Sequence, residues 1–132
     1  MFRGSCLCGT ARYELHISEE AAKKASLQPI DTFLRPAIPA AFKLTAGALK
    51  TVAARHIDEG FEFTTAFCGE CGSTIYALPP GDAPPKIVLV QAGTLDDALP
   101  IEVAPERELN VKDRPDWVSA VKGAVQCRTY EP

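Results

Sequence analysis

The stretch Phe67-Cys68-Gly69-Glu70-Cys71-Gly72-Ser73 has the C-x-x-C-G spacing of a zinc knuckle, and the earlier stretch Gly4-Ser5-Cys6-Leu7-Cys8-Gly9 carries a second cysteine pair. In the first, a tight turn can point two thiolates at one ion, and the following glycine relieves backbone crowding. In the second, a locally extended backbone sends positions i and i+2 to the same side. Two such pairs complete a closed tetrahedral site of four soft ligands. We therefore predict one structural Zn²⁺ ion held by Cys6, Cys8, Cys68 and Cys71.

Two alternatives to a metal site are ordinary buried cysteines and one or two disulfides. Two glycine-flanked pairs so far apart in sequence favour zinc over chance placement. Residues 1–4 lead directly into the first pair without an apolar stretch, so we expect no secretory signal. We expect a reducing, cytoplasmic location, where disulfides are disfavoured. Cys127 is the fifth cysteine and belongs to neither pair.

Length and charge limit the classes of protein that fit. A chain of 132 residues predicts one domain, residues 1–132, small enough for a metal to contribute strongly to its stability. The formal net charge is -3 and lysines and arginines form no block, which argues against a nucleic-acid partner or an anionic membrane. Apolar runs are too short for a membrane span. We expect a soluble protein, and the sequence leaves its oligomeric state open.

Alternating or wholly apolar runs predict strands along most of the chain. The predicted strands span residues 10–15, 42–44, 51–57, 61–67, 73–78 and 87–90, with weaker candidates at 99–103 and 107–111. Asp58-Glu59-Gly60 is a turn signal that joins the third and fourth strands into a hairpin. The run Ile87-Val88-Leu89-Val90 is apolar throughout, which predicts a strand buried on both faces.

Few helices are expected. Ser18 is suited to cap a short helix that begins with two glutamates, and Pro115 is suited to start another, in which Trp117 and Val121 lie one turn apart and Gly123 ends the helix. Three prolines in residues 28–41 predict an extended or looped passage there, without a regular element. The predicted fold is mainly β, with packed antiparallel sheets clipped by zinc and short peripheral helices.

Five segments carry a family resemblance. They are Gly4-Ser5-Cys6-Leu7-Cys8-Gly9-Thr10-Ala11-Arg12-Tyr13-Glu14, Phe42-Lys43-Leu44-Thr45-Ala46-Gly47, Phe67-Cys68-Gly69-Glu70-Cys71-Gly72-Ser73, Gly93-Thr94-Leu95-Asp96-Asp97 and Arg114-Pro115-Asp116-Trp117-Val118. In this order they resemble the glutathione-dependent formaldehyde-activating enzyme and centromere protein V family, which implies an Mss4-like fold of packed antiparallel sheets. The resemblance also implies that the four paired cysteines hold the structural zinc.

The resemblance implies carbon-sulfur lyase chemistry on thiol adducts of small molecules, such as the adduct of glutathione with formaldehyde. Enzymes of the family carry a second, catalytic zinc on a central C-H-C-x-x-C motif. Between Tyr13 and Phe42 this chain has no cysteine, and its one histidine there is His16. An open zinc site needs three protein ligands and a vacant position, so the catalytic zinc cannot form in the family's way.

A replacement site would draw on other side chains, some of them in or near residues 27–36, where the family's catalytic loop would lie. A surface position is the simpler interpretation of His16 and Arg35, and a buried inert thiol that of Cys127, although Arg128 beside it could activate a thiolate. His56, beside the predicted turn, is more simply a hairpin residue than a ligand. The weak catalytic candidates are Asp31, Arg35, His16, Tyr76 and Cys127.

The sequence therefore predicts a zinc-binding protein of lyase class by resemblance, a divergent enzyme acting on a small molecule or thiol adduct without the central motif. The alternative is a non-catalytic, zinc-stabilised binding protein for a small molecule or a protein partner. A third possibility is a lyase that recruits a second metal through unexpected ligands.

Overall fold

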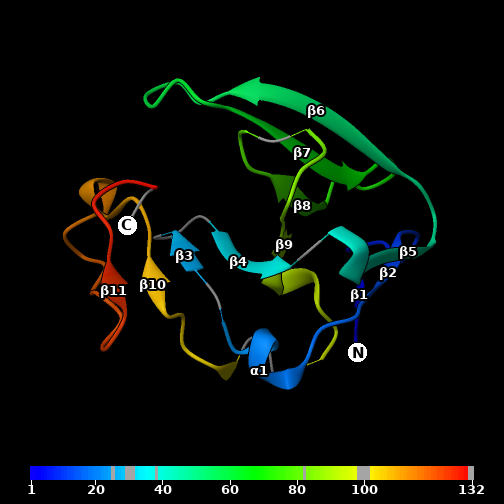
Figure 1. The fold of residues 1–132 in the computed structure, drawn as a ribbon, viewed down its shortest axis with the longest axis horizontal. Helices are drawn as coiled ribbons and strands as arrows, with labels where there is room; N and C mark the ends of the chain where they lie inside the picture. The colour runs from blue at the N-terminus through cyan, green and yellow to red at the C-terminus, as the bar shows by residue number, and fades with distance from the viewer. Residues whose placement is uncertain (25, 29–31, 38, 82, 98–101, 131–132) are drawn as a thin grey trace.

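The computed structural model describes residues 1–24, 26–28, 32–37, 39–81, 83–97 and 102–130, with the backbone alone for 26–28 and 32–36. Its described residues form two β-sheets (Figure 1). In the three-stranded sheet the order is β1 (Phe2–Ser5), β2 (Arg12–Leu15) and β5 (Phe42–Ala46), and both pairings are antiparallel.

The eight-stranded sheet is also mostly antiparallel. Among its described residues, the parallel pairs are those of β10, with β3 and with β11. The prediction of a mainly β protein with antiparallel sheets is therefore confirmed. The strand order is β11 (Val125–Gln126), β10 (Arg107–Glu108), β3 (Ser26–Gln28), β4 (Thr32–Ala37), β9 (Val88–Gln91), β8 (Thr74–Leu78), β7 (Glu62–Cys68) and β6 (Leu49–Arg55).

Helices in the described residues are short. Helix α1 (Glu19–Ala22) begins after Ser18, whose hydroxyl accepts a hydrogen bond from the Ala21 N–H at 3.1 Å, as the predicted cap requires. Single 3₁₀ turns form η1 (Pro39–Ala41), η2 (Ala92–Thr94) and η3 (Val111–Asp113). No helix in the described ranges has the length and apolar character needed to cross a bilayer.

Strand β2 shows how alternation builds the core. Tyr13 and Leu15 are buried, while Arg12 is exposed and Glu14 half-buried on the opposite face, as predicted. The Tyr13 ring stacks on Phe42 with centroids 4.8 Å apart, and a Cβ at Gly4 would lie 2.1 Å from the Tyr13 ring. Only glycine therefore permits this packing. Burial of each large side chain contributes about 1.5–3 kcal/mol.

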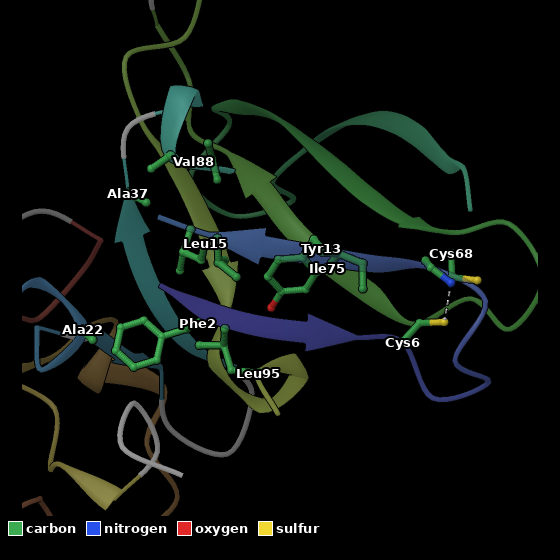
Figure 2. Close-up of a cluster of buried hydrophobic side chains, with 13 residues drawn as sticks. Phe2, Cys6, Tyr13, Leu15, Ala22, Ala37, Cys68, Ile75, Val88 and Leu95 are labelled. Atoms are coloured by element: carbon green, nitrogen blue, oxygen red, sulfur yellow. Dashed lines mark hydrogen bonds between the residues drawn. The ribbon is translucent and has the colours of Figure 1, made fainter. Parts of the chain in front are cut away.

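The predicted hairpin is confirmed as β6 and β7. Gly60 occupies the turn with φ of +74°, a conformation that glycine adopts without strain. Along β7, Ala66 and Cys68 are buried on the same face because they are two residues apart. The hairpin thus delivers Cys68 to one end of the core, where Cys6 also lies (Figure 2).

The prediction that residues 28–41 contain no regular element is wrong, because they include β4. This strand pairs with β9, with Pro36 opposite Leu89. The prolines suggested a loop, but among the described residues the last pair of β4 with β3 is Leu34 with Ser26. Pro36 therefore lies past the end of that ladder, where its missing N–H breaks no pairing with β3.

The expected helix beginning at Pro115 is also wrong. One turn forms there, with the Val118 N–H donating to the Pro115 carbonyl at 3.0 Å. Trp117 is 77% exposed, so the side chain expected to anchor the helix buries little apolar area. A short helix without a buried face is not stable.

Three strand predictions need smaller corrections. Within residues 107–111, only β10 is a strand, and Val111 begins η3. Residues 99–101 lie outside the described residues, and Glu102 and Val103 are not in a strand. In β9, Val88 and Val90 are buried and Leu89 is half-buried, so one face, not both, is fully covered.

Candidate metal centre

Two tight turns carry the four paired cysteines. Cys6 follows β1, and its N–H donates to the Ala11 carbonyl at 3.0 Å. Cys68 ends β7, and its N–H donates to the Ser73 carbonyl, also five residues ahead, at 2.9 Å. Each turn contains a left-handed glycine, Gly9 or Gly72, with φ of +76° or +78°. The turns curl the chain so that both cysteines of each pair point to one place.

The thiol positions fit a tetrahedral site. All four Sγ atoms lie within 4.8 Å of one another, with Cys6 to Cys8 at 3.5 Å and Cys8 to Cys68 at 3.9 Å. A tetrahedral ion with Zn–S bonds of about 2.3 Å would place its sulfurs about 3.8 Å apart. All four cysteines are free thiols. This cluster can hold a metal ion, as the sequence predicted.

Burial within the cluster is uneven. Cys6 and Cys68 are buried, Cys71 is half-buried and Cys8 is exposed. Cys6 and Cys68 belong to the core cluster that also contains Tyr13 and Ile75 (Figure 2). The site is thus attached to the apolar core on one side and closed by a surface turn on the other.

The polar surroundings favour thiolates at two of the four sulfurs. Hydrogen bonds from the Ser73 hydroxyl and N–H, and from the Cys8 N–H, lower the pKa of the Cys71 thiol to about 5. Burial and the Cys71 thiol raise the pKa of Cys6, but hydrogen bonds from the Ala11 N–H and from the thiols of Cys8 and Cys68 outweigh them, so the pKa of Cys6 is lowered.

Cys68 behaves differently. The N–H groups of Cys71 and Glu70 favour its thiolate, but burial and the thiols of Cys6 and Cys71 together outweigh them and raise the Cys68 pKa. Close thiolates repel one another, and a divalent cation removes that repulsion. The donor set therefore suits a soft divalent metal.

Two hydroxyl groups at the cluster were missed by the sequence analysis. The Thr10 hydroxyl lies 3.2 Å from the Cys8 sulfur, and the Ser73 hydroxyl lies 3.1 Å from the Cys71 sulfur. Each follows its cysteine by two residues, in Cys-Gly-Thr and Cys-Gly-Ser. This repeated pattern was the signal that could have identified them. Outer-shell hydrogen bonds of this kind orient metal ligands.

The histidines lie in separate hydrogen-bonded settings. His16 Nε2 lies 2.9 Å from Glu14 Oε2 and is half exposed. His56 Nδ1 accepts hydrogen bonds from the N–H groups of Asp58 and Glu59, and its Nε2 lies 3.0 Å from the Tyr130 hydroxyl. His56 is therefore a turn residue in the hairpin, in agreement with the simpler interpretation.

The other candidate residues are not gathered into one site. Cys127 is 3% exposed beside β11, and Tyr76 packs edge-on against Phe42 at 5.0 Å. Arg35 lies in β4 opposite Val90, and only its backbone is described; Asp31 lies outside the described residues. Among the described side chains, the four cysteines are the one group of three or more potential ligands that lie close together.

Comparison with solved structures supports the fold. The crystal structure of a Rhodobacter sphaeroides protein aligns with a TM-score of 0.53 and 17% sequence identity, covering 78% of this chain and 97% of that chain. At this identity the likeness concerns the fold alone. No curated protein matches the chain in sequence.

A family model provides the assignment. The model described as glutathione-dependent formaldehyde-activating enzyme matches residues 33–113, which is more than half of the chain and includes Cys68 and Cys71. The match agrees with the resemblance noted in the sequence segments. The chain therefore belongs to the glutathione-dependent formaldehyde-activating enzyme family.

Proposed function

We propose that the protein is a zinc-stabilised member of this family that acts on a small organic substrate, with carbon-sulfur lyase as the reaction class suggested by the family. The observation that carries the metal assignment is the cluster of four thiols at tetrahedral spacing. A ligand set made only of sulfur favours zinc over magnesium or calcium. A four-cysteine site is closed, so this ion supports the fold and takes no part in the reaction.

The proposed zinc connects the two sheets. Cys6 and Cys8 follow β1 of the three-stranded sheet, while Cys68 ends β7 and Cys71 lies between β7 and β8 of the eight-stranded sheet. Structural zinc sites have apparent binding free energies of about 10–16 kcal/mol in small peptides, similar to the net stability of a domain. In this proposal residues 1–132 fold as one Mss4-like unit in a reducing compartment such as the cytoplasm, where the thiols remain available to the metal.

A second candidate function is that of a non-catalytic binding protein for a small molecule or a protein partner. One observation favours it: the chain has no cysteine between Cys8 and Cys68, so the central C-H-C-x-x-C motif of the family enzymes is missing. A catalytic zinc needs three protein ligands. The described side chains offer no second group of ligands that would replace them.

One experiment separates the two candidates. The purified protein is incubated with the adduct of glutathione and formaldehyde, and both breakdown and binding of the adduct are measured, before and after treatment with a mild chelator. The enzyme is supported if the adduct breaks down faster than the uncatalysed rate, and if this breakdown persists after chelator treatment has left one metal ion per chain. Saturable binding without breakdown supports the binding protein. Neither breakdown nor binding would contradict both roles for this ligand class.

A further inference from the structure

The outer face of the three-stranded sheet contains a groove of about 270 Å³. Its polar lining comes from all three strands and from the segment that follows η2: Arg3, Arg12, Glu14, Thr45 and Asp96. The alternation along β2 turns Tyr13 into the core and leaves its two charged neighbours on this face. The groove is a feature of the sheet itself, and the four thiols do not line it.

Strand register brings two arginines of the groove together. Arg3 is opposite Glu14, and Ser5 is opposite Arg12, so the two arginines are diagonal neighbours on adjacent strands. Diagonal neighbours lie about 7–8 Å apart, so two long side chains at such positions can bind the same group of a ligand. The Arg12 Nε donates to the Gly9 carbonyl at 3.0 Å, which steadies that side chain and leaves its two NH₂ groups free of this bond. Within the described residues neither arginine makes an ion pair.

Two carboxylates of the groove lie beside these arginines without pairing to them. Glu14 Oε2 is held by His16 Nε2, and Asp96 Oδ1 accepts the hydrogen bond of the Ser5 hydroxyl at 2.8 Å. Each carboxylate has a second oxygen that these contacts do not use. The groove therefore presents separate positive and negative groups to a ligand.

We propose that this groove binds the α-amino acid end of a small zwitterion, with the carboxylate between Arg3 and Arg12 and the ammonium group toward Glu14 and Asp96. Planar guanidinium groups match a carboxylate through paired hydrogen bonds. The two acidic side chains repel a phosphate and attract an ammonium group, so the mixed lining selects against a simple anion. The inference rests on the proposed function for its choice of ligand, because glutathione, which the family name specifies, ends in such a group.

The test uses the full-length, metal-loaded protein and S-methylglutathione, whose methylated sulfur cannot become a thiolate ligand or exchange with thiols. Amide NMR titration should show saturable shifts in β1, β2 and Thr45. Arg3→Gln and Arg12→Gln should each weaken binding by about tenfold, since each removes a charged hydrogen-bond donor pair. The matched control is Arg55→Gln, an exposed arginine in β6 that pairs with Glu62, which should change binding less than about twofold. Metal content confirms that each variant keeps its fold.

Three results would overturn the inference: no saturable shift at millimolar ligand, binding unchanged in both arginine variants, or inorganic phosphate binding as tightly as S-methylglutathione. A further probe is the same ligand with its amino group acetylated. It should bind about fivefold more weakly or worse because the ammonium contact is lost, and equal affinity would exclude the zwitterion. S-methylglutathione carries no formaldehyde to release. Its binding is therefore measured independently of any lyase activity. Binding in the groove can be absent while lyase activity is present, and the reverse can also occur.

Discussion

The C-terminal ends of β1 and β7 lie at one end of the molecule, and β10 and β11 lie at the other (Figure 1). The chain turns that follow β1 and β7 bring four thiols together, whereas β10 and β11 meet around the carboxylate of Glu108. Glu108 is 1% exposed and accepts hydrogen bonds from Arg114 at 2.8 Å, from the Val121 N–H at 2.9 Å and from Gln126 at 2.7 Å. Both ends have a polar centre in place of a large apolar one. In our proposal, only the thiol end depends on a component that the chain does not supply, a metal ion.

This difference predicts which change lowers the stability of each end. At the thiol end Leu7 is 91% exposed and Cys8 lies at the surface, so apolar burial adds little beyond Cys6 and Cys68. In small regions with little apolar burial, a bound metal can supply the stability that a hydrophobic core would otherwise provide. At the carboxylate end the charge of Glu108 is balanced by partners on the same chain. The stability of this end is therefore lowered by mutation of these residues, and the supply of metal does not affect it.

The largest expected effect is at the thiol end. Cys68→Ser should remove one ligand and with it most of the net stability, about 5–15 kcal/mol for a domain of this size, giving insoluble or unfolded protein. Soluble yield and thermal melting followed by circular dichroism provide the measurement. The matched control is Cys127→Ser, which changes a buried cysteine outside the cluster and should fold and keep its metal. A soluble Cys68→Ser protein that melts cooperatively would contradict the account.

The next largest effect is at the carboxylate end. Glu108→Ala should lower the free energy of unfolding by about 3–5 kcal/mol, because it leaves the guanidinium of Arg114 without its buried partner. Denaturant unfolding measures this loss, and metal content should stay unchanged. Glu106→Ala is the control, since its side chain is exposed, and should cost less than about 0.5 kcal/mol. If Glu108→Ala lowered the free energy of unfolding as little as Glu106→Ala, Glu108 would not be a stabilising centre of its end of the molecule.

A smaller effect concerns the core beside the thiol end and depends on pH. Burial raises the pKa of Tyr13 to about 12, with the Thr94 hydroxyl opposing the shift and Asp96 adding to it. The unfolded chain therefore loses this proton near its ordinary pKa of 10, before the folded chain does, so stability falls as pH rises from about 10 to 12. Denaturant unfolding should show a loss of about 1 kcal/mol between pH 9 and pH 11. Tyr13→Phe should abolish this part of the pH dependence, and an identical slope in both proteins would refute the assignment.

The smallest expected effect is at Trp117, near the carboxylate end. Because its side chain is 77% exposed, Trp117→Ala should change the free energy of unfolding by less than about 0.5 kcal/mol. The measurement is denaturant unfolding under the conditions used for Glu108→Ala. A loss above about 2 kcal/mol would mean that Trp117 is buried against the rest of the chain.

The two ends also differ in how far the sequence predicts them. The thiol end was predictable because the spacing of the ligands is visible within two short segments of the sequence, Cys6-Leu7-Cys8 and Cys68-Gly69-Glu70-Cys71. Glu108 was not, because its partners are 6 to 18 residues away and a single glutamate gives no pattern. Helix signals at Pro115 failed for a related reason, since they say nothing about what the Trp117 side chain packs against.

The sheet shows the same limit. Local alternation predicted β2 and the hairpin of β6 and β7, whose registers depend on neighbouring residues and one turn. Strand β4 was missed because proline suggests a loop from its local effect on strand pairing. The pairing of β4 with β9, however, joins residues far apart in sequence, such as Arg35 and Val90, which are 55 positions apart. Long-range pairing overrides such local signals.

The central claim, that one structural metal holds the thiol end together, is tested most directly by the zinc content of the folded chain. Protein purified without added metal is analysed for zinc per chain while chelator is added and folding is followed by circular dichroism. The account predicts one zinc per chain, lost only as the protein unfolds. A chain that stays folded and cooperative after its zinc has been removed, or that folds without any metal, would contradict it.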